Sequence, residues 1–196
     1  IQLDLPPFTL VAATTRVALL SSPLRSRFSG GVFRLQFYDT EEITEILIRS
    51  ADILGVDAAE DALQEIAKRS RYTPRTANYF LKRCRDFAQV NDSSLTKETV
   101  KKALSLLEID SLGLGEHDRN ILTTIIEKFG GGPVGLNTLA AALAEDESTI
   151  EEVHEPYLMR VGLLERTPRG RIATEKAHDH LDEDYESSNQ QTLVNS

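Results

Sequence analysis

The sequence predicts a mainly α-helical protein with more than one domain. Apolar residues recur at helical spacing throughout residues 39–109. Residues 110–181 continue with three further helical patterns and end in two short runs typical of a β-hairpin. The first 38 residues differ from both regions, because their apolar runs are short enough to be strands. With 196 residues, 40% of them hydrophobic, the chain is long enough to bury a substantial core.

Residues 1–38 are expected to be the end of an α/β domain. The apolar run Phe8–Ala12 fits a buried strand of a parallel sheet. The alternating residues Phe33–Phe37 fit a second strand, and Gly30 and Gly31 mark the turn before it. The other strands of such a sheet are absent from this sequence.

The segment between these two strands carries candidate ligand-binding residues. Thr14, Thr15 and Arg16 follow the first strand, at the position where open α/β sheets bind their ligands. Arg25 and Arg27 follow in a short helical stretch, and two nearby guanidinium groups suit a planar anion such as phosphate. The residues alone fit a strand, a turn and a solvated basic helix equally well.

Four helices are expected between residues 39 and 109. The first runs from a cap at Asp39–Thr40 to Leu54 and is stopped by the glycine that follows. The second covers about residues 58–70. The third starts at Thr73–Pro74, with threonine as N-cap and proline in the first turn, and the fourth follows Thr96. The third helix has an inward stripe that consists of Ala77, Phe80, Leu81, Cys84, Phe87 and Ala88.

Residues 110–181 are expected to form three helices and then a hairpin. The helices cover about residues 118–129, 137–144 and 148–161, and the strands residues 163–167 and 171–174. Asn137 is the expected cap of the second helix, and Ser148–Glu151 reads as a capping box that opens the third. Pro168–Gly170 forms the tight turn of the hairpin. The polar tail from Asp182 onward is expected to be disordered.

Charge is distributed unevenly along the chain. The net charge is −9, yet residues 1–38 hold four Lys and Arg against one Asp, whereas residues 110–196 hold seven against 17 acidic residues. Within that acidic part, Arg166, Arg169, Arg171 and Lys176 cluster against Glu175 alone. An acidic domain with one basic prong favours contact through the prong over a broad electrostatic footprint.

The composition excludes several classes of protein and site. A single cysteine cannot form a disulfide framework, which is consistent with a reducing cytoplasm. No apolar run approaches membrane-spanning length, and the first residues lack the layout of a signal peptide. The four histidines show no ligand spacing, so no metal site is expected.

Phosphoryl transfer needs parts that this sequence lacks. The phosphate-loop pattern GxxxxGK[ST] is absent, and GGGPVG at 130–135 has neither the lysine nor the hydroxyl, so we expect only a turn there. No apolar strand ends in the Asp-Glu pair that usually serves magnesium. Because the phosphate loop and the magnesium carboxylates are missing, we expect this chain to be inactive as an ATPase by itself. It begins Ile1-Gln2 without a start methionine and reads as a fragment.

Five motifs carry a family resemblance. They are LPPFTLVAATTR with SPLRSRF in the first 28 residues, TPRTAN at 73–78, GGGPVGL at 130–136, EPYL at 155–158 and RTPRGRIAT at 166–174. In this order they resemble the RuvB family, the AAA+ motors of bacterial Holliday-junction branch migration. The resemblance extends to about Leu181. AAA+ proteins in general share the first motif.

The resemblance implies a domain for each part of the chain. Residues 1–38 would be the C-terminal end of the AAA+ α/β core, with sensor 1 and the arginine finger. Residues 39–109 would be the four-helix AAA+ lid, with sensor 2. Residues 110–181 would be a winged-helix DNA-binding domain, and residues 182–196 the disordered tail.

The resemblance also implies nucleotide-contact residues. Arg27 matches the arginine finger, which an AAA+ subunit offers to the nucleotide of its ring neighbour, and Thr15 matches the first sensor. Arg75 matches the second sensor, and its place in the first turn of a helix agrees, because free N–H groups there attract anions. Tyr38 and Pro74 resemble residues that flank the base, although Tyr38 fits an ordinary strand-end aromatic equally well.

DNA contact is implied for three arginines of the wing, Arg166, Arg169 and Arg171. A hairpin tip with cations on both sides can enter a minor groove or grip phosphates. The chain departs from the family pattern on either side of the second sensor, where Tyr72 replaces a glycine and Tyr79 an arginine. It also has Ala12 for glycine and one extra residue after Phe28.

For the intact protein the resemblance implies an ATP-dependent DNA helicase that drives branch migration in recombination, DNA repair and the SOS response. Such a motor is a cytoplasmic homo-hexamer around duplex DNA, works with RuvA and RuvC, and uses ATP and Mg²⁺, whose ligands lie outside this chain. Two other functions remain open from the residues alone. One is a non-catalytic nucleic-acid-binding winged-helix regulator, and the other is a clamp-loader-type AAA+ subunit.

Overall fold

The computed structural model describes residues 6–28 and 30–182. The chain divides into two units, Ile1–Gln36 and Phe37–Ser196. Helices dominate the described residues, and their paired strands are limited to a single two-stranded hairpin. The prediction of a mainly α-helical fold is therefore confirmed. Among the described residues, no helix has the length and apolar character needed to cross a bilayer.

The first unit contains the short helices η1 (Val17–Leu19) and α1 (Ser22–Arg25) and otherwise extended chain. Strands predicted at Phe8–Ala12 and Phe33–Phe37 do not form, since no residue of 6–28 or 30–39 is in a strand. A strand needs a neighbour to pair its N–H and C=O groups, and the described residues provide none for these runs. Their apolar side chains are consequently uncovered, with Val11 87% and Leu35 90% exposed.

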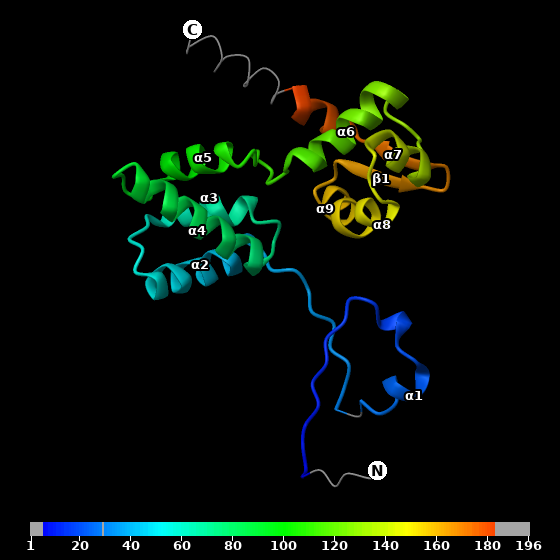
Figure 1. Ribbon diagram of the computed structural model, residues 1–196, viewed down its shortest axis with the longest axis horizontal. Coiled ribbons are helices and arrows are strands. Elements are labelled where there is room, and N and C mark those ends of the chain that lie inside the picture. Colours follow the sequence, from blue (N-terminus) through cyan, green and yellow to red (C-terminus); the bar gives the residue numbers. More distant parts are fainter. Residues whose placement is uncertain (1–5, 29, 183–196) are drawn as a thin grey trace. The chain divides into compact units, whose positions relative to one another are not determined.

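The second unit begins with the four predicted helices, α2 (Thr40–Leu54), α3 (Glu60–Arg69), α4 (Pro74–Val90) and α5 (Lys97–Leu106), which pack against one another (Figure 1). Local signals set their ends. The Asp39 side chain accepts from the Glu42 N–H at 2.8 Å, the Glu42 carboxylate accepts from the Asp39 N–H at 2.9 Å, and Gly55 ends α2 at φ 61°. Thr73 caps α4 by accepting from the Thr76 N–H at 3.4 Å.

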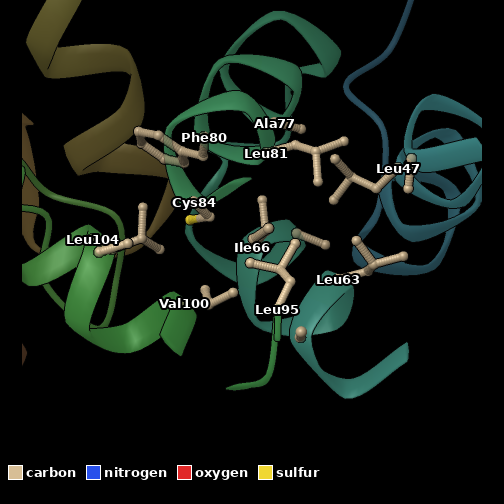
Figure 2. Packing of buried hydrophobic residues seen from close by; sticks show 14 of the residues in the cluster. Leu47, Leu63, Ile66, Ala77, Phe80, Leu81, Cys84, Leu95, Val100 and Leu104 are labelled. Carbon is tan, nitrogen blue, oxygen red and sulfur yellow. The ribbon is translucent and has the colours of Figure 1, made fainter. Parts of the chain in front are cut away.

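One apolar core holds these four helices together. Figure 2 shows Cys84 of α4 pointing into a cluster with Ile66, Val100 and Leu104, and all four side chains are fully buried. Burial raises the pKa of the Cys84 thiol to about 12, so the group stays protonated at neutral pH. Cys84 is thus a core residue, as its place on the inward stripe predicts.

The rest of the second unit is a helical cluster with a hairpin. It comprises α6 (Glu116–Phe129), α7 (Leu136–Leu143), α8 (Glu147–Thr149), the π-helical turn η2 (Ile150–His154), α9 (Glu155–Arg160), β1 (Leu164–Thr167), β2 (Gly170–Ala173) and a helical stretch at 175–182. The two strands are antiparallel, with Arg166 opposite Arg171. Val134 adds a bridge on the outer side of β2 by exchanging two backbone hydrogen bonds with Arg171, at 2.8 and 2.9 Å. A group of helices followed by a hairpin, with a bridging segment at Val134 on the free side of β2, is the arrangement of a winged helix.

Three details of this region differ from the prediction. Helix α7 starts after Gly135, so Asn137 lies within its first turn and instead donates to Glu147 Oε1 at 2.9 Å. The capping box at Ser148–Glu151 does not form, because α8 starts at Glu147. The expected single helix is broken by η2 directly before α9, where Pro156 lacks the N–H of a regular helix. Apart from Asp182, the predicted disordered tail lies outside the described residues.

Candidate functional site

Two of the predicted nucleotide-contact residues, Thr15 and Arg27, belong to the first unit. Both are exposed. The Arg27 backbone N–H donates to Leu24 O at 3.1 Å, just beyond the end of α1, while its guanidinium forms no ion pair within the described part of the chain. This guanidinium is therefore available to an outside anion. The Thr15 hydroxyl likewise makes no hydrogen bond to the described residues.

The other three, Tyr38, Pro74 and Arg75, belong to the second unit and sit at the starts of two helices. Tyr38 is 42% exposed and directly precedes Asp39, the cap of α2. Pro74 and Arg75 are the first two residues of α4. Arg75 is exposed and has no carboxylate partner among the described residues. A cation in the first helical turn opposes the helix dipole, and an anion bound at the same N–H groups removes that conflict.

The turn that leads into α4 has an unusual backbone. Arg71 and Tyr72 both adopt φ 57°, a conformation that non-glycine residues take only when surrounding contacts impose it. The Arg71 guanidinium lies 4.4 Å from the centre of the Tyr157 ring, and the Tyr72 and Tyr157 ring centres are 6.3 Å apart. The Tyr157 hydroxyl donates to Leu112 O at 2.6 Å, and burial together with Tyr72 raises its pKa to about 12. Residues of α9 thus hold this turn.

Arg160, at the end of α9, contacts the same turn from another side. Its guanidinium carbon lies 4.6 Å from the centre of the Tyr72 ring and 4.5 Å from that of Phe37. No sequence pattern indicates a role for Arg71, Tyr157 or Arg160, and Tyr72 is notable in the sequence only as a departure from the family pattern. These contacts join residues 85 or more positions apart, so helical or strand periodicity gives no signal for them.

Asp118 anchors the same region from α6. Its carboxylate is buried and accepts from the Gly115 N–H at 3.0 Å, lies 2.7 Å from His154 Nδ1, and pairs with Arg71 at 3.4 Å. Burial alone raises the pKa of Asp118, but the hydrogen bond with His154 and the charge of Arg71 outweigh it, so the pKa is lowered. The ionised carboxylate therefore stabilises the fold above its unfolded pKa of about 3.9, and this contribution is lost as the pH falls through the folded value.

The three predicted DNA-contact residues differ in exposure. Arg169 stands at the tip of the hairpin, exposed, and its side chain pairs with no described carboxylate. Arg166 is half-exposed at 51% of its side chain and pairs with Glu151 at 2.7 Å. Both can face an outside polyanion, although Arg166 has first to leave Glu151.

Arg171 does not match the expectation of a free cation beside the tip. Its side chain is only 9% exposed, and its guanidinium donates to both carboxylate oxygens of Glu155, from Nε to Oε1 and from Nη2 to Oε2, the second at 3.2 Å. Glu155 is 2% exposed. In this structure Arg171 therefore forms a buried ion pair between β2 and α9, and its guanidinium would have to leave Glu155 before it could contact DNA.

Gly170 allows the hairpin to approach the backbone of Val134 closely. Its φ is 138°, and a Cβ built on it would lie 2.3 Å from Val134 O. Neither the backbone conformation nor the space allows a larger residue, so the glycine lets β2 pair with Val134 while Arg169 projects outward.

Comparison with known proteins gives matches along nearly the whole chain. Residues 1–35 match the Holliday junction DNA helicase RuvB P-loop domain, residues 38–110 the RuvB AAA lid domain, and residues 111–182 the RuvB C-terminal winged helix domain. Among named relatives, the Holliday junction branch migration complex subunit RuvB of Dehalococcoides mccartyi (strain CBDB1) is 56% identical over 196 residues, which cover 98% of this chain and 56% of the relative. The corresponding subunit of Chloroflexus aurantiacus is 56% identical over 182 residues, with 92% and 52% covered.

A solved structure agrees with these matches. The Thermotoga maritima RuvB Holliday junction branch migration motor superimposes with a TM-score of 0.82 and 53% sequence identity, over 90% of this chain and 59% of that one. This chain thus spans somewhat more than half the length of the relatives that it matches. Because three consecutive RuvB domain models account for residues 1–35, 38–110 and 111–182, the chain belongs to the RuvB family.

Proposed function

We propose that this chain is the nucleotide-sensing and DNA-contacting part of an ATP-driven motor for Holliday-junction branch migration. The observation that carries the proposal is the order of the three RuvB domain matches along one chain, at 56% identity to proteins named as branch migration complex subunits. The matches described above are all to RuvB domains or proteins, so they favour the motor over the clamp-loader and the non-catalytic regulator.

Within this proposal, Arg27 is the arginine finger and Thr15 the first sensor, and both act on the nucleotide of the motor. Arg75 is the second sensor, and Tyr38 and Pro74 flank the base. Support comes from the exposure of Arg27 and Arg75 and from their lack of described carboxylate partners. A guanidinium that is not neutralised inside the protein can give two hydrogen bonds to a phosphate and offset the charge that develops there.

ATP and Mg²⁺ are the proposed cofactors, and the chain's own residues fit only part of such a site. Arg75 with the N–H groups at the start of α4 suits a phosphate, whereas no sequence motif here supplies the phosphate loop or magnesium carboxylates. The rest of the nucleotide site, the homo-hexameric ring, the contacts with RuvA and RuvC, and the cytoplasmic location are proposed by analogy with the family.

The direct test of the proposal is an assay of the full-length protein on a synthetic four-way junction. We expect ATP and Mg²⁺ to convert the junction to duplex products, and a non-hydrolysable ATP analogue to leave it unchanged. A protein that binds the junction tightly but neither hydrolyses ATP nor moves the junction would contradict the motor and favour the regulator.

The proposed DNA contact is the hairpin tip at Arg169, with Arg166 beside it. Replacement of Arg169 by alanine in this chain should weaken binding to duplex DNA by a similar factor for all sequences, since phosphate contacts carry no sequence information. Loss of one phosphate contact should also lower the slope of log K against log [salt] by about 0.9. Fluorescence titration of labelled duplexes at several salt concentrations measures both quantities.

Lys128 on α6 provides a matched control, because it is also an exposed cation of the acidic domain but lies outside the hairpin. Lys128→Ala removes the same charge and should leave the salt slope near that of the parent. If Lys128→Ala reduced the slope and Arg169→Ala did not, the hairpin tip would not be the contact.

A further inference from the structure

One guanidinium of the winged-helix part contacts residues next to two groups of proposed nucleotide contacts, Tyr38 in one segment and Pro74 with Arg75 in the other. Arg160 lies over the rings of Phe37 and Tyr72, at 4.5 and 4.6 Å. Phe37 is the residue before Tyr38, and Tyr72 comes three residues before Arg75. Phe37 and Tyr72 are 35 residues apart in sequence, so Arg160 is a physical link between the two segments.

The link is stiff on the side of Arg75. Thr73 donates its N–H to Ser70 O at 3.2 Å and caps α4, and Pro74 has a fixed φ in the first turn. Tyr72 therefore has little freedom to turn without moving the start of α4. Its own φ of 57° is unfavourable for a tyrosine, so contacts of its ring have to hold the turn in place.

The link is also stiff on the side of Tyr38. Tyr38 is flanked by Phe37, which packs against Arg160, and by Asp39, whose reciprocal hydrogen bonds with Glu42 fix the start of α2. A backbone held at both neighbours gives the intervening side chain a defined direction.

We propose that Tyr72 and Arg160 are positioning residues for the nucleotide: through the Phe37–Arg160–Tyr72 stack, the winged-helix domain sets the placement of Tyr38 and Arg75. The inference rests on the nucleotide roles proposed above for Tyr38 and Arg75. It adds that the DNA-binding part of the chain helps to build the ATP site. A stack that served only to hold two domains together would affect stability but not the affinity for nucleotide.

The test is steady-state ATP hydrolysis by the full-length protein with DNA present. Tyr72→Gly removes the ring and permits the positive φ, so its effect does not come from backbone strain. Arg160→Ala removes the cation and leaves both rings. Since one exposed cation–π contact changes an equilibrium by a factor of about two to five, we expect either change to raise the KM for ATP by about two- to fivefold, with kcat within about twofold of the parent.

Two further variants make the result specific. Tyr72→Phe keeps the ring and should retain the parental KM. Arg83→Ala removes a contact of the same kind, on Tyr79 at 5.4 Å, outside the stack, and should also retain it. In this chain alone, Tyr72→Gly and Arg160→Ala should shift the amide NMR signals of Tyr38 and Arg75, whereas Tyr72→Phe should leave them in place.

The inference would be overturned if Tyr72→Gly and Arg160→Ala had the parental KM for ATP, even if both melted at a lower temperature. In that case the ATPase activity of the parent would still support the proposed function. An equal rise in KM for Arg83→Ala would overturn it too, because the effect would then not be specific to the stack. A parent protein without any ATPase activity would instead overturn the proposed function, and this inference with it.

Discussion

Arg27→Ala in the full-length protein is expected to lower the rate of ATP hydrolysis by about 10³–10⁵-fold, the range seen when arginine fingers are removed from related NTPases. Binding of nucleotide should change little, because a finger acts mainly on charge that develops in the transition state. The structure supports this choice, since Arg27 is exposed and its guanidinium pairs with no carboxylate of the described chain. Turnover with Mg²⁺ and DNA, and titration with a fluorescent ATP analogue, measure the two quantities separately.

Arg25 is a close control for this experiment. It is also exposed and lies two residues earlier, at the end of α1, so Arg25→Ala removes the same charge from the same segment. We expect Arg25→Ala to lower the rate of ATP hydrolysis far less than Arg27→Ala does.

Because the finger is proposed to act on a neighbouring subunit, mixing Arg27→Ala with a phosphate-loop mutant should restore part of the turnover. Hydrolysis by Arg27→Ala at the parental rate would show that Arg27 is not the finger.

The lid helices were predictable because their signals are local. Asp39 with Glu42, Gly55 after Leu54, and Thr73 with Pro74 lie next to the helix ends that they determine, and the structure has caps at all three places. Such interactions involve residues up to about four positions apart, which a sequence displays directly.

The predicted strands of the first unit failed for the opposite reason. Phe8–Ala12 has the composition of a buried strand, but strand formation depends on hydrogen bonds to another segment. In residues 6–28 and 30–36 no such segment pairs with it. The apolar pattern indicates that the side chains of this run need to be buried, but it does not provide the neighbouring strand that would pair with the run and bury them.

The sequence indicated which residues belong to the candidate sites, but it did not indicate how their side chains pack or which partners they have. Exposure at Arg27, Arg75 and Arg169 agrees with the roles proposed for them. The stack of Arg160 on Tyr72 and the pair of Arg171 with Glu155 depend on how α9 packs, and no spacing in the sequence encodes that. Arg169 and Arg171 look equivalent in the motif, yet one is at the tip and the other on a strand that faces α9.

The difference between these two arginines leads to the second large effect. Arg171→Met should destabilise this chain by about 3–5 kcal/mol, because it leaves the Glu155 carboxylate buried without its main partner. Arg166 remains as a weak partner, with its nearest nitrogen 4.0 Å from Glu155, which places the expected loss toward the lower end. Urea denaturation followed by circular dichroism gives the change in free energy of unfolding. Arg166→Met, a change at the cross-strand neighbour, should cost less than about 1 kcal/mol, since Arg166 is half-exposed.

Replacement of both partners separates the role of the ion pair from that of DNA contact. The double variant Arg171→Met with Glu155→Leu removes both buried charges, so most of the lost stability should return. If Arg171 serves only the fold, this restored variant should bind duplex DNA with the affinity and salt slope of the parent, whereas Arg169→Ala reduces both. A stable double variant whose salt slope falls by about 0.9 would show instead that Arg171 leaves Glu155 to contact a phosphate, as the wing motif implies.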